Sequence, residues 1–179
     1  MTGVQTCALP ICNWPRLVEL SASLVNEDGK TLQTLGALVY PDGFEIPDEA
    51  SRVSGITTEM AKTAGSPAKD VLEAFGKMAL CADYFVCHNL EYDFPVLFAE
   101  SIRCGVTIPV LDGFCTKAQT TELMKIPNTS SYGGTYKWPK LKELHTFCFG
   151  DEHEGQHRAG GDVEATKNVF FHIRKHHIG

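Results

Sequence analysis

Two short stretches of this sequence carry residue types that could do chemistry. The first runs from His157 to Asp162, and the residues after it recur at three-to-four spacing, as in a helix with one buried face: Ala165, Thr166, Val169, Phe170 and Ile173. Asp162 stands at the head of that face, and His157 lies close enough to serve the same spot. A carboxylate aimed at an apolar interior either pairs with a bound cation or caps the first turn of the helix. This stretch alone leaves both interpretations open.

The second stretch is His88-Asn-Leu-Glu-Tyr-Asp93. It follows the apolar run 84–87, which is short enough for a buried strand, and it begins a helix that Gly105 ends. Asp93 again heads an apolar face, with Val96 and Leu97 one turn further on. Two carboxylates at strand-to-helix junctions favour a shared chemical role over two unrelated helix caps.

The elements that must position these residues follow from apolar periodicity and stop signals. We expect a half-buried strand at 18–24 that returns antiparallel through 31–40, and further strands at 84–87 and within 110–116. Helices are expected at 47–53, from Thr57, from Pro67, from the Asp93 stretch to Cys104, from Trp138 to Gly150 with Leu141, Leu144 and Phe147 inward, and after Asp162. This order predicts an α/β layered fold with its site at the ends of strands.

Composition narrows the class of protein. The 179 residues suit one domain, and the net charge of -6 argues against broad binding to duplex backbones. Seven scattered cysteines without a C-x-x-C pair predict reduced thiols and a cytoplasmic location. No apolar run approaches membrane-spanning length, so no membrane partner is expected. A zinc site built from Cys148, His153 and His157 ranks last, because it lacks a closely spaced first pair of ligands.

The first twelve residues are expected to differ in origin from the rest. Residues 3–11 resemble the translation of a sequencing-library adapter, so we take residues 1–12 as a non-native leader and 13–179 as the domain.

From residue 13 to 175, the motifs resemble the DnaQ-like 3′–5′ exonucleases of the DEDDh type, within the ribonuclease H-like superfamily. The stretch from His88 to Asp93 resembles that family's second motif, and the stretch from His157 to Asp162 resembles the third motif in its histidine form. The residues 13–20, 54–60 and 138–144 resemble the second strand, a connector helix and the helix before the third motif. The resemblance implies a mixed sheet flanked by helices.

It also implies a chemistry. The family uses four carboxylates to hold two Mg²⁺ or Mn²⁺ ions, and a histidine as general base, to release nucleoside monophosphates from single-stranded DNA or RNA 3′ ends. Carried over, Asp93 and Asp162 are metal ligands, and His157 is the catalytic base. His88 and Asn89 either position the terminal nucleotide or shape the turn. Polymerase association and homodimer formation both occur in the family, and the sequence does not choose between them.

One departure from the family is large. Its first motif, an Asp-x-Glu on the central strand, should precede Trp14, yet no acidic residue precedes Glu19. Glu19 is not taken as a substitute, because the resemblance assigns it to the second strand. We therefore expect the central strand to be missing or replaced, and the chain as written to be inactive or impaired. The alternative function is a non-catalytic nucleic-acid-binding or polymerase-associated module of the same fold.

Overall fold

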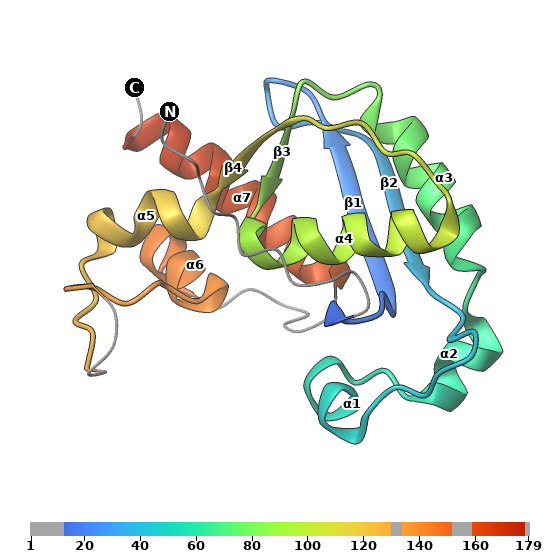
Figure 1. The fold of residues 1–179 in the computed structure, drawn as a ribbon. Helices are drawn as coiled ribbons and strands as arrows, with labels where there is room; N and C mark the ends of the chain where they lie inside the picture. Colours follow the sequence, from blue (N-terminus) through green and yellow to red (C-terminus); the bar gives the residue numbers. More distant parts are fainter. Residues whose placement is uncertain (1–12, 130–133, 152–158, 178–179) are drawn as a thin grey trace, which may run out of the picture.

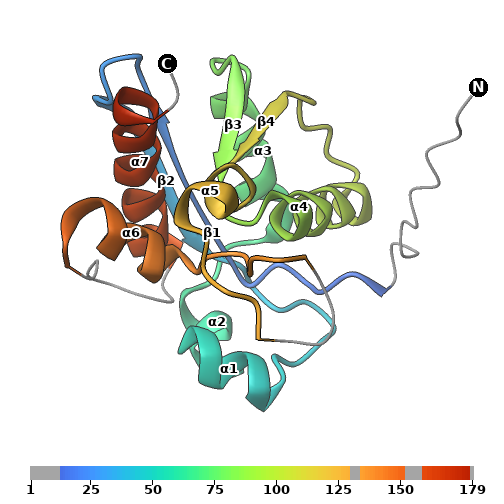
Figure 2. The same ribbon diagram turned by 90° about the vertical axis from the view of Figure 1, so that its left-hand side faces the viewer.

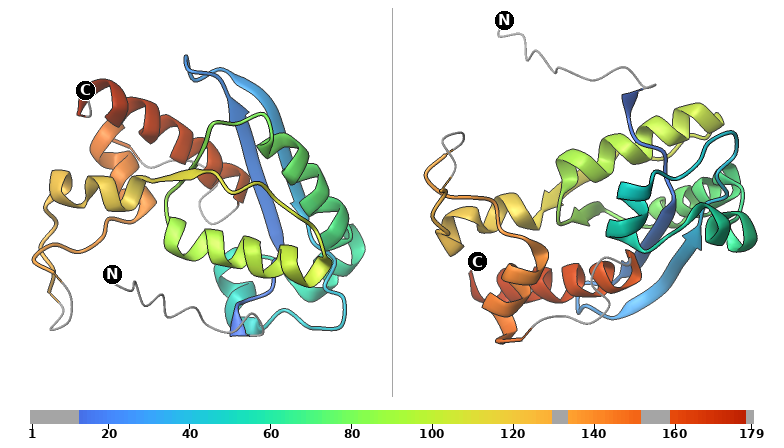
Figure 3. Two further views of the ribbon diagram at one scale, coloured as in Figure 1. Left: turned by 45° about the horizontal axis from the view of Figure 1, so that its top comes forward. Right: turned by 90° about the horizontal axis from the view of Figure 1, so that it is seen from below.

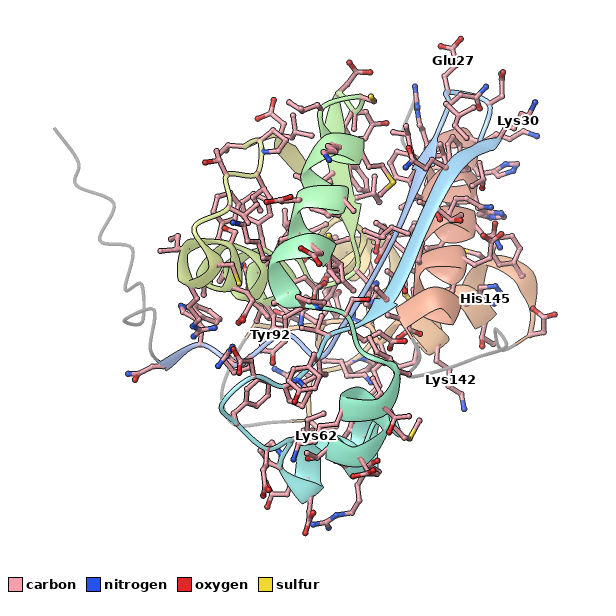
Figure 4. The ribbon with its side chains drawn as sticks, turned by 90° about the vertical axis from the view of Figure 1, so that its right-hand side faces the viewer. Glu27, Lys30, Lys62, Tyr92, Lys142 and His145 are labelled. Atoms are coloured by element: carbon pink, nitrogen blue, oxygen red, sulfur yellow. The ribbon has the colours of Figure 1, made fainter. Side chains whose placement is uncertain are left out.

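The computed structural model describes residues 13–129, 134–151 and 159–177, and its first strands form a hairpin (Figure 1). Strands β1 (Glu19–Val25) and β2 (Thr31–Leu38) pair antiparallel, from Glu19 opposite Leu38 to Val25 opposite Thr31. The turn between them is closed by the Asn26 side chain, whose Oδ1 accepts the Lys30 N–H at 2.8 Å. Figure 4 shows Glu27 and Lys30 at the hairpin tip, at the opposite end of the molecule from Lys62 on helix α2 (Thr58–Ala64). The hairpin predicted from alternation is confirmed.

A second pair of strands is parallel. Strand β3 (Tyr84–Cys87) pairs with β4 (Asp112–Cys115), with Tyr84 opposite Asp112 and Cys87 opposite Cys115. Within the described ranges, no further strand joins this pair to the hairpin. The α/β fold class is therefore confirmed, and the described residues supply two strand pairs in place of one continuous sheet.

Helices cover the two faces of these strands, which gives three layers (Figures 2 and 3). Helix α7 (Ala159–His176) packs on β1 and β3 from one side, while α3 (Ala68–Ala79) and α4 (Leu90–Cys104) lie on the other. The apolar faces predicted for α3 and α7 are buried, as their spacing requires: Val71, Leu72, Phe75, Met78 and Ala79 on α3, and Ala165, Thr166, Val169, Phe170 and Ile173 on α7. These faces fill the core on both sides of the strands.

Shorter helices connect the layers. Helix α1 (Asp48–Ser54) and α2 pack below the hairpin, and α5 (Thr116–Met124) leads toward α6 (Leu141–Phe149). Helices α1, α4 and α6 each end at a glycine with positive φ, the conformation that glycine adopts most readily. The prediction for α6 was correct for Leu144, which is fully buried, and wrong for Phe147, which is 47% exposed. Phe147 instead lies beside the His177 ring, with the two ring centroids 6.1 Å apart.

A buried ion network fixes the residues before β1 to helix α4. Glu100 is fully buried, and its carboxylate accepts from Arg16 at 3.0 Å and from Arg103 at 2.8 Å. Arg103 also donates to the Trp14 carbonyl oxygen at 2.7 Å. The chain therefore enters β1 along a defined path over α4. In the ranges that the structure describes, no helix is both long and apolar enough to cross a membrane.

Candidate active site

The parallel pair β3 and β4 brings two loop segments to one edge. Because parallel strands end at the same side of a sheet, the residues after Cys87 and those after Cys115 become neighbours. His88 Nδ1 lies 2.9 Å from Thr116 Oγ1, and the Cys115 thiol donates to the His88 carbonyl oxygen at 3.4 Å. Burial, the nearby Asp93 charge and Cys115 together raise the pKa of Cys87 to about 12, so that this thiol stays protonated. The edge predicted to hold the site is thus assembled from both strands.

His88 joins three segments of the chain. Its Nδ1 contacts Thr116 at the start of α5, and its Nε2 lies 3.0 Å from the Pro139 carbonyl oxygen. Both ring nitrogens are therefore engaged with the protein, and His88 holds the segment before α6 against the strand ends. Of the two roles open for His88, these contacts favour shaping the site through its neighbours.

Asn89 and Asp93 both lie at the start of helix α4. Asn89 is the N-cap residue, and its carbonyl oxygen accepts the Asp93 N–H at 2.9 Å. The Asn89 side-chain oxygen accepts a 2.5 Å hydrogen bond from the Lys117 ammonium. Lys117 is only 8% exposed, so this ammonium lies within the protein beside the start of α4.

Asp93 and Asp162 are electrostatic neighbours, although they come from different helices. The pKa of Asp93 is raised, first by burial of the carboxylate and also by repulsion from Asp162. A backbone hydrogen bond from Asn89 and the Lys117 charge oppose that rise. Asp93 as a whole residue is nevertheless exposed, so its carboxylate stays open to solvent. A carboxylate whose charge is repelled by a second carboxylate forms the kind of site at which a cation is favourable.

The start of α7, the helix that carries Asp162, contacts the first residue of β1. Glu19 Oε2 accepts the backbone N–H of Ala159, the first residue of α7, at 3.1 Å. A carboxylate here satisfies a free N–H of the first turn and interacts favourably with the helix dipole. Glu19 thus has a structural contact at the beginning of α7, and Asp162 lies one turn further along the helix.

The candidate ligands are of the type that binds divalent cations, but the described residues supply few of them. Carboxylate oxygens are the ligands that Mg²⁺ and Mn²⁺ prefer, and Asp93 and Asp162 supply them. Among the residues that the structure describes, no group of three or more His, Cys, Asp or Glu side chains is placed to hold a metal ion. His157, His153 and the leader at 1–12 lie outside the described residues.

Sequence reasoning did not identify Lys117 as part of this site. Helix α5 has almost no apolar periodicity, so neither the helix nor its first residues could be found from a repeating pattern. A signal was nevertheless present, because Thr116 and Lys117 directly follow a strand that runs parallel to β3. The carboxyl ends of two adjacent parallel strands share an edge, and this places Lys117 next to Asn89.

The comparison with protein families finds one family model along most of the chain. The model RNase_T, described as Exonuclease, matches residues 1–170. The 3′–5′ exonuclease DinG of Bacillus subtilis is 28% identical over 85% of this chain and 15% of its own length. The Three-prime repair exonuclease 1 of Bos taurus is 28% identical over 78% of this chain and 46% of its own length. The chain thus spans less than half the length of these curated relatives.

Solved structures share the fold. Exonuclease I of E. coli, in complex with an oligonucleotide, superimposes with a TM-score of 0.71 at 16% identity. The match covers 89% of this chain and 37% of that one. This likeness confirms the ribonuclease H-like fold expected from the motifs.

Proposed function

This chain belongs to the RNase_T family of exonucleases, and from that premise we propose that it is a metal-dependent 3′–5′ exonuclease domain. Its substrates are single-stranded DNA or RNA ends, from which it releases nucleoside monophosphates. The relatives from Bacillus subtilis and Bos taurus are both 3′ exonucleases by name, which supports this direction of cleavage. The oligonucleotide held by Exonuclease I supports a single strand as the substrate.

One observation supports the proposal: Asp93, which follows the parallel strand β3, interacts electrostatically with Asp162 of α7. Burial raises the pKa of Asp93 and the Asp162 carboxylate raises it further, although Asp93 lies in the first turn of α4 and Asp162 in the first turn of α7. Two carboxylates brought together in this way are destabilising in the absence of a cation. A role in binding divalent cations explains why the fold retains this unfavourable pair.

Each residue has a distinct part in the proposed reaction. Asp93 and Asp162 would hold the divalent cations, which when bound supply positive charge to the scissile phosphate and acidify the attacking water. His157 accepts the proton of that water as general base. Asn89, held by Lys117 at 2.5 Å, fixes the start of α4 and thereby the orientation of Asp93. His88 keeps the segment before α6 in place through Pro139.

We also propose that the chain as written is impaired in this reaction. The family's Asp-x-Glu motif has no counterpart ahead of Glu19 in this sequence, and two carboxylates hold Mg²⁺ weakly because the ion keeps its own waters. Adding the missing carboxylates on a strand that can pair beside β1 should therefore raise activity.

The test is a fusion that places a strand carrying Asp-x-Glu ahead of Asn13. Single-stranded DNA and RNA oligonucleotides labelled at the 5′ end are incubated with Mn²⁺, and products are separated by length. We expect a ladder that shortens from the 3′ end, at least a hundredfold faster than with the chain as written. The matched control carries Asn-x-Gln in the same strand. Equal rates for the fusion, its control and the original chain would refute the proposal.

A second candidate is a nucleic-acid-binding module without chemistry. It is favoured by one observation, that the described residues supply no group of three or more side chains for a metal ion. It predicts that Asp162→Ala leaves binding of a single strand unchanged and that the Asp-x-Glu fusion cleaves nothing. The exonuclease proposal predicts instead that Asp162→Ala abolishes cleavage by the fusion.

A further inference from the structure

Trp138 presents a large aromatic surface to solvent beside the candidate active site. Trp138 is 54% exposed and lies in the segment that precedes helix α6. The Lys117 ammonium lies 3.9 Å from the centroid of the indole, so one face of the ring is covered by a cation. A cation over the face of a tryptophan ring is a favourable contact, strongest where the cation is shielded from water. Lys117 is shielded, because it is only 8% exposed.

Two contacts fix this indole relative to Asp93. The same Lys117 ammonium donates to Asn89 Oδ1 at 2.5 Å, and Asn89 caps the helix that carries Asp93. On the other side, the Pro139 carbonyl oxygen lies 3.0 Å from His88 Nε2. Lys117 thus contacts the indole itself, and His88 holds the backbone of the next residue, in a segment that has no regular structure of its own.

We propose that Trp138 is a stacking platform for an unpaired nucleobase near the strand end, and that Lys117 positions it. This inference rests on the proposed function, since it assigns the base-binding surface of the same site. Aromatic faces next to positive charge are the features that bind single strands without sequence preference, because every base has a π face. The carboxylate pair and its cations would take the phosphates, while the indole takes a base. The occupant is therefore a single-stranded nucleic acid rather than a duplex, whose bases already stack on each other.

The experiment measures binding with the chain as it exists. The sequence has two tryptophans, so Trp14→Phe leaves Trp138 as the only strongly fluorescent indole. Trp14 contributes its backbone carbonyl to the Arg103 contact, which phenylalanine retains. In this background, a single-stranded oligonucleotide added with Mn²⁺ should quench the fluorescence of Trp138. Anisotropy of a labelled oligonucleotide should show affinity falling about tenfold or more in Trp138→Ala and little in Trp138→Phe.

An abasic scan separates stacking from a merely structural role. A series of oligonucleotides is prepared, each of which lacks the base at a different position counted from the 3′ end. The wild type should bind one member of this series more weakly than the intact oligonucleotide, namely the one that lacks the stacked base. That penalty should vanish in Trp138→Ala, which has no platform to lose. The matched control is Phe147→Ala, which removes an aromatic residue of similar exposure, 47%, near the far end of α7. It should bind all the oligonucleotides as the wild type does.

The outcomes distinguish this inference from the proposed function. If the wild type binds the strand, and Trp138→Ala retains both the affinity and the abasic penalty, the stacking platform is refuted while the exonuclease proposal stands. If the wild type binds no oligonucleotide at all, the platform is also refuted, and the cleavage assay of the Asp-x-Glu fusion decides the proposed function separately. Circular dichroism of Trp138→Ala and Trp138→Phe confirms that both variants fold.

Discussion

At the scale of single residues, the two buried charged side chains that the structure describes, Glu100 and Lys117, both lie against neighbours that compensate for their charge. Glu100 is fully buried and is matched by two arginines, one from the chain before β1 and one from its own helix. Lys117 is buried against an aromatic ring and an amide oxygen. Asp93 differs, because its pKa is raised first by burial of the carboxylate and further by repulsion from a second carboxylate, Asp162, while Asn89 and Lys117 oppose that rise. The exonuclease proposal gives Asp93 and Asp162 a functional role, whereas the Glu100 network has a structural one.

The structural role of Glu100 predicts a large loss of stability when its charge is removed. Glu100→Gln leaves two arginines partly without their counter-charge, and we expect the free energy of unfolding to fall by about 3 kcal/mol. Urea denaturation followed by circular dichroism measures this change. The matched control is Glu164→Gln, which removes the exposed carboxylate of an ion pair with Lys167 on α7 and should alter stability by less than about 0.5 kcal/mol. Similar effects from the two variants would show that Glu100 does not anchor the N-terminal segment.

At the scale of elements, the predictable parts were those with strong periodicity. The hairpin and the helices α3, α4 and α7 were found because their apolar faces repeat at the period of a strand or a helix. Strand β3 was found as a short apolar run, and β4 lies within the predicted range 110–116, although it begins at Asp112-Gly113, where an interruption was expected. Helix α5 was missed because threonines and a buried lysine occupy its inner face. Phe147 was placed inward by spacing alone, yet α6 is short and packs chiefly through Leu144. Tertiary contacts decide such elements, and periodicity carries no information about them.

A tight junction between elements gives a second stability prediction. Gly65 ends α2 where the chain passes Tyr40, and a Cβ there would overlap the Ala61 carbonyl oxygen and lie 2.6 Å from the Tyr40 backbone nitrogen. Because both are backbone atoms in a hydrogen-bonded junction, Gly65→Ala should cost at least about 2 kcal/mol of stability. The control is Gly160→Ala in the first turn of α7, where a Cβ meets nothing within 4 Å. Thermal unfolding should show a lower midpoint for Gly65→Ala and an unchanged or slightly higher one for Gly160→Ala.

At the scale of the whole molecule, the fold brings together residues that are distant in the sequence. The motifs at Asp93 and Asp162 were predicted from the sequence, and the two carboxylates interact electrostatically although α4 and α7 lie on opposite faces of the strands. The contribution of Lys117 and Trp138 could not be read from spacing, because it depends on β4 running parallel beside β3. His157 lies outside the described residues, so its role as base stays a prediction.

The most direct test of this account is Mn²⁺ binding by the chain as written, measured from the loss of the free-ion signal in electron paramagnetic resonance. We predict weak binding by the wild type that both Asp93→Asn and Asp162→Asn abolish, because each variant removes half of the carboxylate pair. Glu27→Gln, which alters an exposed acid at the hairpin tip, should bind as the wild type does. Binding that survives in both asparagine variants would contradict a shared cation site at Asp93 and Asp162.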